Sequence, residues 1–101
     1  MRPRPAGRTM FRLRARVCKN NHCLRETVVE EGSGDTRTHK VLHALNQAVM
    51  ELDLAEPIWL EKNIRDFQRH ARCRFDRDSF VEEIDFDYLE IAVLEEDGDF
   101  V

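Results

Sequence analysis

Two cysteines and two histidines form the most chemically suggestive pattern in the sequence, Cys18-x4-Cys23-x15-His39-x3-His43. Thiolates and neutral imidazoles are the ligands that complete a tetrahedral Zn²⁺ shell. The cysteines flank a predicted turn, and the histidines are about one helical turn apart on a predicted helix. The pattern therefore defines one candidate function, a zinc-binding module.

Distance argues against that zinc site. The pattern resembles a two-cysteine, two-histidine zinc finger, but fifteen residues separate its two pairs, against about twelve in that family, and the expected aromatic residue between them is missing. The extended chain from Cys23 to Gly32 covers about 30 Å, and the first helical turn recovers only about 6 Å. We therefore expect no metal and no cofactor.

A second pattern is a set of arginines on a predicted helix. Arg65, Arg69 and Arg72 follow i, i+4, i+7 spacing, so they share one helix face and could follow a phosphate backbone. The periodicity of Phe67 and Phe75 places both aromatic rings in the core and not on a stacking surface. The acidic isoelectric point of about 5.5 also opposes polyanion binding. Nucleic-acid contact through this face is therefore an alternative and not the leading hypothesis.

Catalytic patterns are missing from the sequence. The short Gly32-Ser33-Gly34 segment has neither the length nor the lysine of a phosphate-binding loop. The two serines, Ser33 and Ser79, do not lie in a nucleophile-elbow context. The carboxylates near the C-terminus alternate with apolar residues, as in an amphipathic strand. We expect no enzyme and no small-molecule substrate.

Charge is distributed unevenly along the 101 residues, although the net charge is only −4. Residues 1–20 carry seven basic side chains and no acid, whereas residues 78–101 carry ten acids and no base. The two ends of the chain can attract each other or recruit different partners. An odd count of three cysteines and no secretory signal indicate a reduced, cytoplasmic setting. No apolar run is long enough to predict a membrane-spanning helix.

The remaining patterns predict secondary structure around those residues. Residues 1–9 are expected to be a disordered leader before Met10, the suspected natural start. Residues 11–17 alternate apolar and arginine positions, as in a half-buried strand. Asn20 and Asn21 predict a turn, and Trp59 is expected to anchor the core. The elements expected beyond the turn are a strand over 23–31, helices over 36–53 and 63–73, and a strand over 86–95.

Together these elements predict a single small α+β domain over residues 10–96, in the order ββααβ. We expect a three-stranded sheet of order 2-1-3, its last strand parallel to the first, with two helices packed on one face. Arg12, Arg14 and Arg16 would then project from the first strand toward Glu90 on the last. Residues 97–101 are expected to form an acidic, disordered tail.

The leading hypothesis for function is a non-catalytic protein-interaction or regulatory module that associates with itself or with another protein. The second strand would lie at the edge of the sheet and lacks the lysine or proline that blocks edge pairing. Antiparallel pairing of two copies of this strand would give a homodimer. The candidate interface combines this strand with an exposed helix strip: Arg25, Thr27, Glu30, Glu31, His39, His43 and Met50.

Overall fold

The computed structural model describes residues 11–31 and 36–95 of the chain. The predicted leader, Met10, the 32–34 segment and the predicted acidic tail lie outside these described residues. In chain order the elements are β1 (Phe11–Lys19), β2 (His22–Glu31), α1 (Arg37–Leu52), α2 (Glu61–His70), β3 (Arg72–Phe75), the short 3-10 helix η1 (Arg77–Ser79) and β4 (Tyr88–Glu95).

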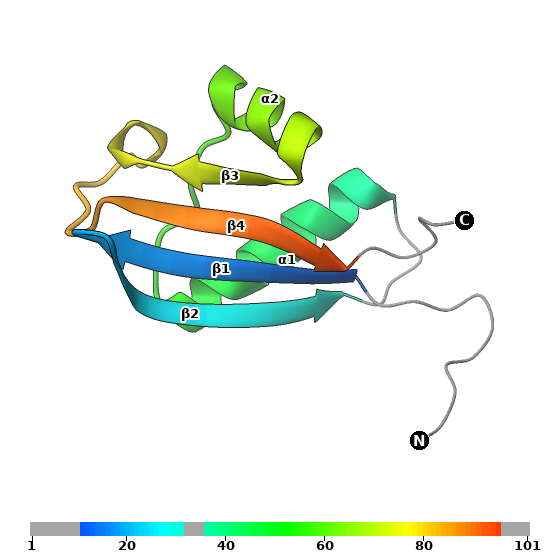
Figure 1. The fold of residues 1–101 in the computed structure, drawn as a ribbon, viewed down its shortest axis with the longest axis horizontal. Helices are drawn as coiled ribbons and strands as arrows, with labels where there is room; N and C mark the ends of the chain where they lie inside the picture. Colours follow the sequence, from blue (N-terminus) through cyan, green and yellow to red (C-terminus); the bar gives the residue numbers. More distant parts are fainter. Residues whose placement is uncertain (1–10, 32–35, 96–101) are drawn as a thin grey trace.

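The described strands form one sheet of four strands in the order β2-β1-β4-β3, as Figure 1 shows. The predicted small α+β domain is confirmed, and the last strand does lie beside the first. The predicted three-stranded order 2-1-3 is wrong, because β3 adds a fourth strand at the edge. That extra strand reverses the chain once more, so β4 runs antiparallel to β1 and not parallel to it.

The β1–β2 hairpin closes through the two asparagines that predicted a turn. Asn20 and Asn21 have φ angles of 53° and 66°, a left-handed conformation that asparagine tolerates well and that suits a two-residue hairpin loop. The Asp87 carboxylate accepts a hydrogen bond from the Asn20 amide at 2.8 Å. The Asp87 amide donates to the Cys18 carbonyl at 2.9 Å. These two bonds attach the start of β4 to the turn.

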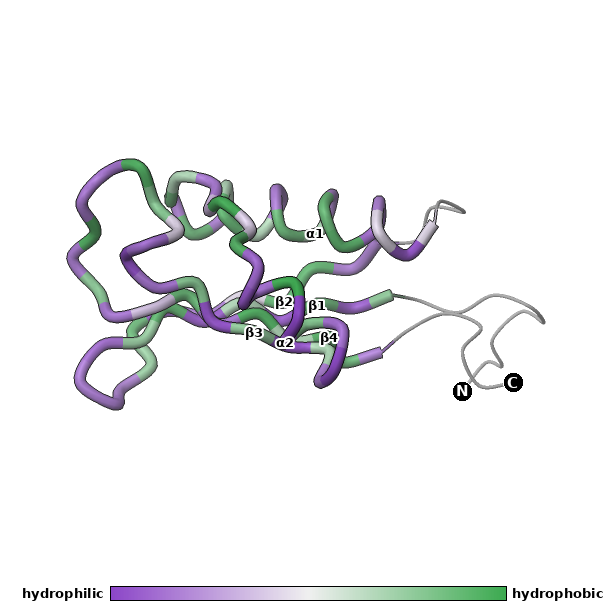
Figure 2. Tube along the Cα trace, turned by 90° about the horizontal axis from the view of Figure 1, so that it is seen from above, coloured by the Kyte–Doolittle hydropathy of each residue, from purple (hydrophilic) through white to green (hydrophobic). Residues whose placement is uncertain are grey.

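Helix α1 covers one face of the sheet, where it packs against β1 and β2. Its N-cap Thr36 accepts a hydrogen bond from the His39 amide at 3.3 Å, which satisfies one free donor of the first turn. Figure 2 shows α1 as a layer beside the strands. Leu42 is exposed. The apolar residues of α1 that are buried toward the sheet are Val41, Ala44, Leu45, Ala48, Val49 and Leu52.

Helix α2 ends earlier than predicted, at His70, because Ala71 adopts a left-handed conformation with φ of 57°. The chain then continues as β3, so residues 72 and 73 are not helical. Asn63 lies in the first turn of α2 and is not its N-cap, which is Leu60. The helical periodicity of residues 63–73 predicts a buried Ile64, but this side chain is 44 % exposed. Only Phe67 carries α2 into the common core.

The core lies between α1 and the covered face of the sheet, and α2 packs against β3 beside it. Trp59 packs against this core as predicted, with its ring edge-on to Phe67 at 5.6 Å and to Phe75 at 4.9 Å between centroids. Burial raises the pKa of the Cys73 thiol to about 12, so this thiol is inert at neutral pH. Both helices contribute to one core, although only α1 lies across the sheet.

Candidate binding surface

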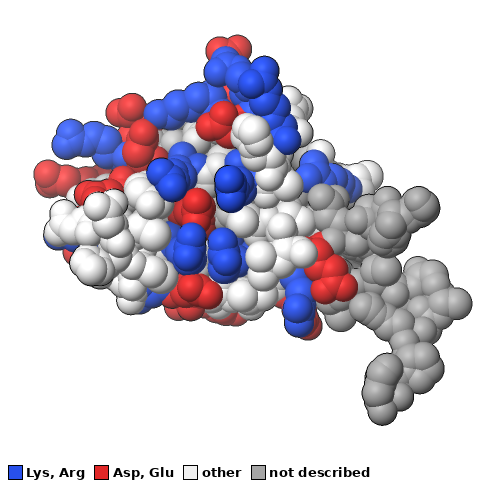
Figure 3. Space-filling view, viewed as in Figure 1, with Lys and Arg blue, Asp and Glu red and all other residues white. Residues whose placement is uncertain are grey.

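The face of the sheet opposite α1 carries most of the charged strand residues, and we call it the open face. Apolar side chains of β1 point to the core, so the alternating arginines of that strand point the other way. Figure 3 shows Lys and Arg side chains over the middle of the sheet, with acidic side chains between and around them. The strand register places these residues on the open face: Arg12, Arg14, Arg16, Glu26, Val28, Glu30, Arg72, Arg74, Glu90, Ala92 and Glu95.

Cross-strand register divides the open face into rows perpendicular to the strands. In the first row, Glu90 lies between Arg16 and Arg74. Its Oε1 atom is 2.7 Å from Arg16 Nη2, and its Oε2 atom is 3.5 Å from Arg74 Nε. Arg74 also lies over the Tyr88 ring, with its Cζ atom 4.5 Å from the centroid. Both carboxylate oxygens of Glu90 are therefore engaged by arginines.

These contacts set the protonation of the pair. Burial alone would raise the pKa of Glu90, but the hydrogen bond from Arg16 and the charges of Arg16 and Arg74 outweigh burial, so its pKa is lowered. The hydrogen bond to Glu90 raises the pKa of Arg16. Both pKa shifts favour the charged forms of the two partners, so Glu90 is an ionised carboxylate at neutral pH. The predicted approach of Arg16 to Glu90 is thus confirmed.

The arginine in the row near the start of β1 also has carboxylate partners. Arg12 Nε lies 3.2 Å from Glu30 Oε2 and 3.8 Å from Glu95 Oε1. A register shift between Arg12 and Leu13 leaves Leu94 without a direct partner on β1. This row holds two carboxylates for one guanidinium, so it has no spare positive charge.

The middle row differs from its neighbours. Arg14 and Arg72 both pair with Ala92, one from each side, and Val28 completes the row. Among the described residues, no hydrogen bond or ion pair involves the side chain of Arg14 or of Arg72. Ala92 is only 7 % exposed although it belongs to the open face. The row therefore presents two uncompensated guanidinium groups on either side of a methyl group.

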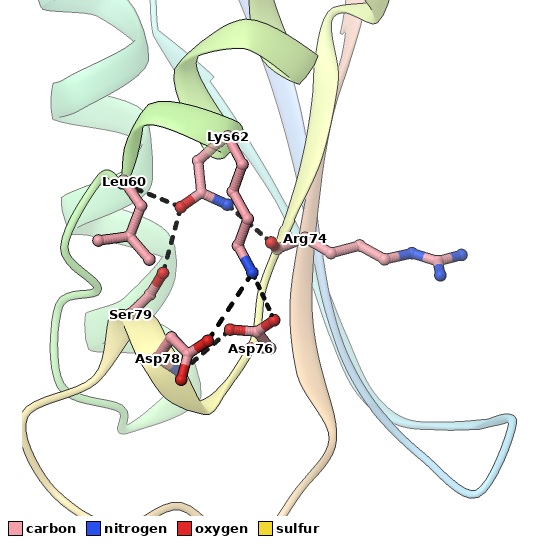
Figure 4. Close-up of polar contacts among 7 residues, drawn as sticks. Leu60, Lys62, Arg74, Asp76, Asp78 and Ser79 are labelled. Carbon is pink, nitrogen blue, oxygen red and sulfur yellow. Dashed lines mark hydrogen bonds and ion pairs between the residues drawn. The ribbon is translucent and has the colours of Figure 1, made fainter.

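Buried polar contacts hold β3, and with it Arg72 and Arg74, at the edge of the sheet. Asn63 is 1 % exposed; its Nδ2 donates to the Arg74 carbonyl at 2.8 Å. Its Oδ1 accepts from the Leu60 amide at 3.0 Å and from the Ser79 hydroxyl at 3.2 Å. Figure 4 shows the Arg74 backbone in this cluster while its side chain extends to the other side of the strand. The Asn63 cluster thus fixes the position of an open-face arginine.

An exposed ion pair lies beside the Asn63 cluster. Lys62 Nζ donates to Asp76 Oδ2 at 2.8 Å and lies 4.0 Å from Asp78 Oδ2 (Figure 4). The hydrogen bond from Lys62 lowers the pKa of Asp76 and that bond also raises the pKa of Lys62. Asp76 caps η1 through the Asp78 amide at 3.0 Å. The pair links α2 to the loop after β3.

The arginines predicted as a nucleic-acid face do not share one face. Arg65 and Arg69 are exposed on α2, but Arg72 belongs to β3 and lies on the open face. The signal that was missed is the alternation Arg72-Cys73-Arg74-Phe75, with exposed and buried residues in turn. Arg72 therefore joins Arg14 and not the two helix arginines.

The predicted protein interface lies along the β2 edge and α1. Arg25 Nη1 donates to the Leu52 carbonyl at 2.6 Å, and Thr27 Oγ1 donates to Glu51 at 2.5 Å, a bond that lowers the pKa of Glu51. Glu31 lies 3.8 Å from His43, whose ring stacks on His39 at 6.3 Å. Glu30 pairs with Arg12. Of the predicted interface residues, Met50 is the prominent exposed apolar side chain, at 68 %.

The structure does not bring the four candidate zinc ligands together. Cys18 and Cys23 face each other beside the hairpin turn, whereas His39 and His43 lie near the start of α1, close to Glu31 at the other end of β2. Within residues 11–31 and 36–95, no group of three or more metal-ligating side chains forms a site. The three thiols are free.

A groove of about 310 Å³ separates α1 from α2. Its apolar lining combines Val41 and Leu42 of α1 with Trp59, Ile64 and Phe67. Arg37 lies over the Phe67 ring at 5.4 Å from the centroid. The polar residues Arg37, Thr38 and Gln68 complete the lining.

Among the described residues, no helix is long and apolar enough to cross a membrane. Comparison with protein-family models, curated proteins and solved structures gives no match.

Proposed function

We propose that this chain is a non-catalytic binding module, and that its open face binds an acidic segment of a partner protein. The observation that supports the proposal is that Arg14 and Arg72 have no carboxylate partner among the described residues, on a face that α1 leaves uncovered and where five arginines meet four carboxylates. Charged surfaces of this kind steer association with a partner of opposite charge. A cytoplasmic location is part of this proposal, and the free thiols support it because thiols stay reduced there.

Charge reversal at the open face tests this function. Calorimetric titration with an oligoglutamate peptide should give binding that weakens as salt rises, because surface charges are screened. Arg14→Glu or Arg72→Glu should reduce that binding by about tenfold or more. The matched controls Arg65→Glu and Arg69→Glu carry the same charge change on α2 and should bind like the parent protein.

Titration with an oligonucleotide of similar charge distinguishes the proposed function from the alternative, nucleic-acid binding through α2. If single-stranded DNA binds, the peptide does not, and the α2 variants lose that binding, then the chain is a nucleic-acid module acting through α2. If neither probe binds, the open-face proposal is wrong.

Self-association through β2 is a second candidate, because β2 lies at the edge of the four-stranded sheet. Its ten residues contain no lysine, proline or glycine, and Leu24 and Val28 are exposed on it. Such an edge can pair with a second copy of itself. The Arg25 side chain bonds to α1, so backbone pairing and not an Arg25–Glu30 contact would carry the dimer.

Sedimentation equilibrium at micromolar concentration measures this association. Val28→Lys places a charge on the edge strand and should shift a dimer to monomer. Leu94→Lys, an equally exposed apolar position on β4, is the control and should leave the dimer intact. A strictly monomeric parent protein removes this candidate.

A further inference from the structure

The middle row of the open face differs from the rows beside it in its balance of charge. Arg16 and Arg74 share the two oxygens of Glu90, and Arg12 has two carboxylates near it. Those carboxylates are therefore already occupied. Arg14 and Arg72 are left with two positive charges and no partner among the described residues.

The spacing of these two arginines suits one small anion. Directly paired residues on neighbouring strands have Cβ atoms about 5 Å apart. Arg14 and Arg72 flank Ala92 from opposite sides, so their Cβ atoms are about 10 Å apart across β4. Ala92 has a short side chain and is only 7 % exposed, so neighbouring side chains already lie over its methyl group. Two guanidinium groups at this spacing can contact one tetrahedral group between them.

Charge decides which anion fits. A carboxylate carries one negative charge and would leave one guanidinium without compensation. A phosphate monoester carries a charge of about −1.5 to −2 at neutral pH and offers three acceptor oxygens. Guanidinium groups bind such oxygens through paired, charge-assisted hydrogen bonds.

We propose that Arg14, Ala92 and Arg72 form a binding site for a phosphorylated side chain in the acidic segment of the partner protein. The site rests on the proposed function of the open face and specifies the group that this face recognises. Phosphorylation of the partner then regulates its binding to the module.

A short acidic peptide carrying one phosphoserine is the probe. It should bind the full chain at least about tenfold more tightly than the same peptide with serine at that position. The same difference is expected relative to the peptide with glutamate at that position. Arg14→Gln and Arg72→Gln should remove most of that preference. Arg65→Gln on α2 is the matched control and should retain it.

Ala92 supplies two variants that do not remove an arginine. Ala92→Glu places a carboxylate between the two guanidinium groups, so it should abolish the preference for phosphoserine while thermal unfolding stays at or above the parent temperature. Ala92→Leu fills the same space without charge and should also reduce the preference. Retained preference in the folded Ala92→Glu protein would overturn the site.

Inorganic phosphate distinguishes the source of the anion. If it competes poorly with the phosphopeptide, a phosphorylated segment is the ligand. If it binds as tightly as the phosphopeptide, the site takes free phosphate and the proposed source is wrong. If the serine and phosphoserine peptides bind equally, the phosphate site is wrong while binding by the open face stands. If no peptide binds, the proposed function itself fails.

Discussion

At the scale of single residues, Glu90 organises the open face. It joins Arg16 of β1 to Arg74 of β3 across β4, and both of its oxygens are used. The sequence predicted the contact between the β1 arginines and Glu90 because residues 11–17 alternate strictly. It did not predict Arg74, because the helix predicted over residues 63–73 left no strand at this position. The sequence therefore predicted the contact of Glu90 with β1 and not its contact with β3.

Glu90→Gln should lower the free energy of unfolding by about 1–3 kcal/mol at pH 7, because two arginines lose a partly buried anion. Folding lowers the pKa of Glu90, so its contribution is present above the pKa of the unfolded chain, near 4.3. It is lost as the pH falls through the lower, folded pKa. Urea titrations at pH 7 and pH 3 measure this. The difference in the free energy of unfolding between the parent protein and Glu90→Gln should become smaller at pH 3. Glu83→Gln changes an exposed carboxylate and is the control. A gap that is equal at both pH values contradicts this role.

Trp59 makes a separate prediction about packing. Trp59→Ala should cost about 3–5 kcal/mol, because the ring contacts Phe67 and Phe75 at the core. Its buried Nε1 atom has no hydrogen-bond partner within the described residues, so Trp59→Phe should cost clearly less. Thermal unfolding monitored by circular dichroism compares the two variants. Unchanged stability of Trp59→Ala with lost partner binding would instead make Trp59 a recognition residue.

At the scale of elements, β3 is the feature that most changes the fold and the site. The pattern Arg-Cys-Arg-Phe is only four residues long, and a run so short satisfies helical and strand spacing equally well. Arg65, Arg69 and Arg72 also fit a helix face by spacing alone. The left-handed Ala71 that separates α2 from β3 has no glycine or asparagine to signal it. The hairpin, by contrast, was predictable because Asn20 and Asn21 signal their conformation directly.

Asn63 should be the residue on which the attachment of β3 depends. Asn63→Ala removes three hydrogen bonds and leaves buried polar groups of Leu60, Arg74 and Ser79 without their partner, at a cost of about 2–4 kcal/mol. Native-state hydrogen exchange should show that β3 amides lose protection before those of β1. The exposed Asn46→Ala, which loses one bond to Glu56, is the control. Equal protection of β3 in both variants would show that packing alone holds this strand.

At the scale of the whole molecule, opposite charges that are far apart in the sequence are partly paired within the sheet. The basic strand β1 lies beside the acidic strand β4, and Arg12 and Arg16 contact Glu95 and Glu90. Within the described residues, the basic strand β1 and the acidic strand β4 therefore attract each other. The helices and the apolar faces were predictable from periodicity, whereas the balance of charge in each row depends on a register that no local pattern specifies.

The separation of cysteines from histidines predicts that the domain folds without zinc. A metal chelator should leave the thermal unfolding temperature unchanged, because the two cysteines lie near one end of β2 and the two histidines lie on α1 near its other end. Differential scanning calorimetry with and without the chelator is the measurement. Unfolding on chelation, together with stoichiometric zinc in the purified protein, would contradict this arrangement.

Chemical-shift mapping tests most directly whether the open face is the binding surface. Uniformly ¹⁵N-labelled protein is titrated with the acidic oligoglutamate peptide, and every backbone amide and arginine Nε–H signal is followed. Binding at the open face should give saturable shifts in β1, β3 and β4 that are largest near Arg14, Ala92 and Arg72 and that become smaller as salt rises. Shifts confined to α2 around Arg65 and Arg69, or to the β2 edge, would contradict it.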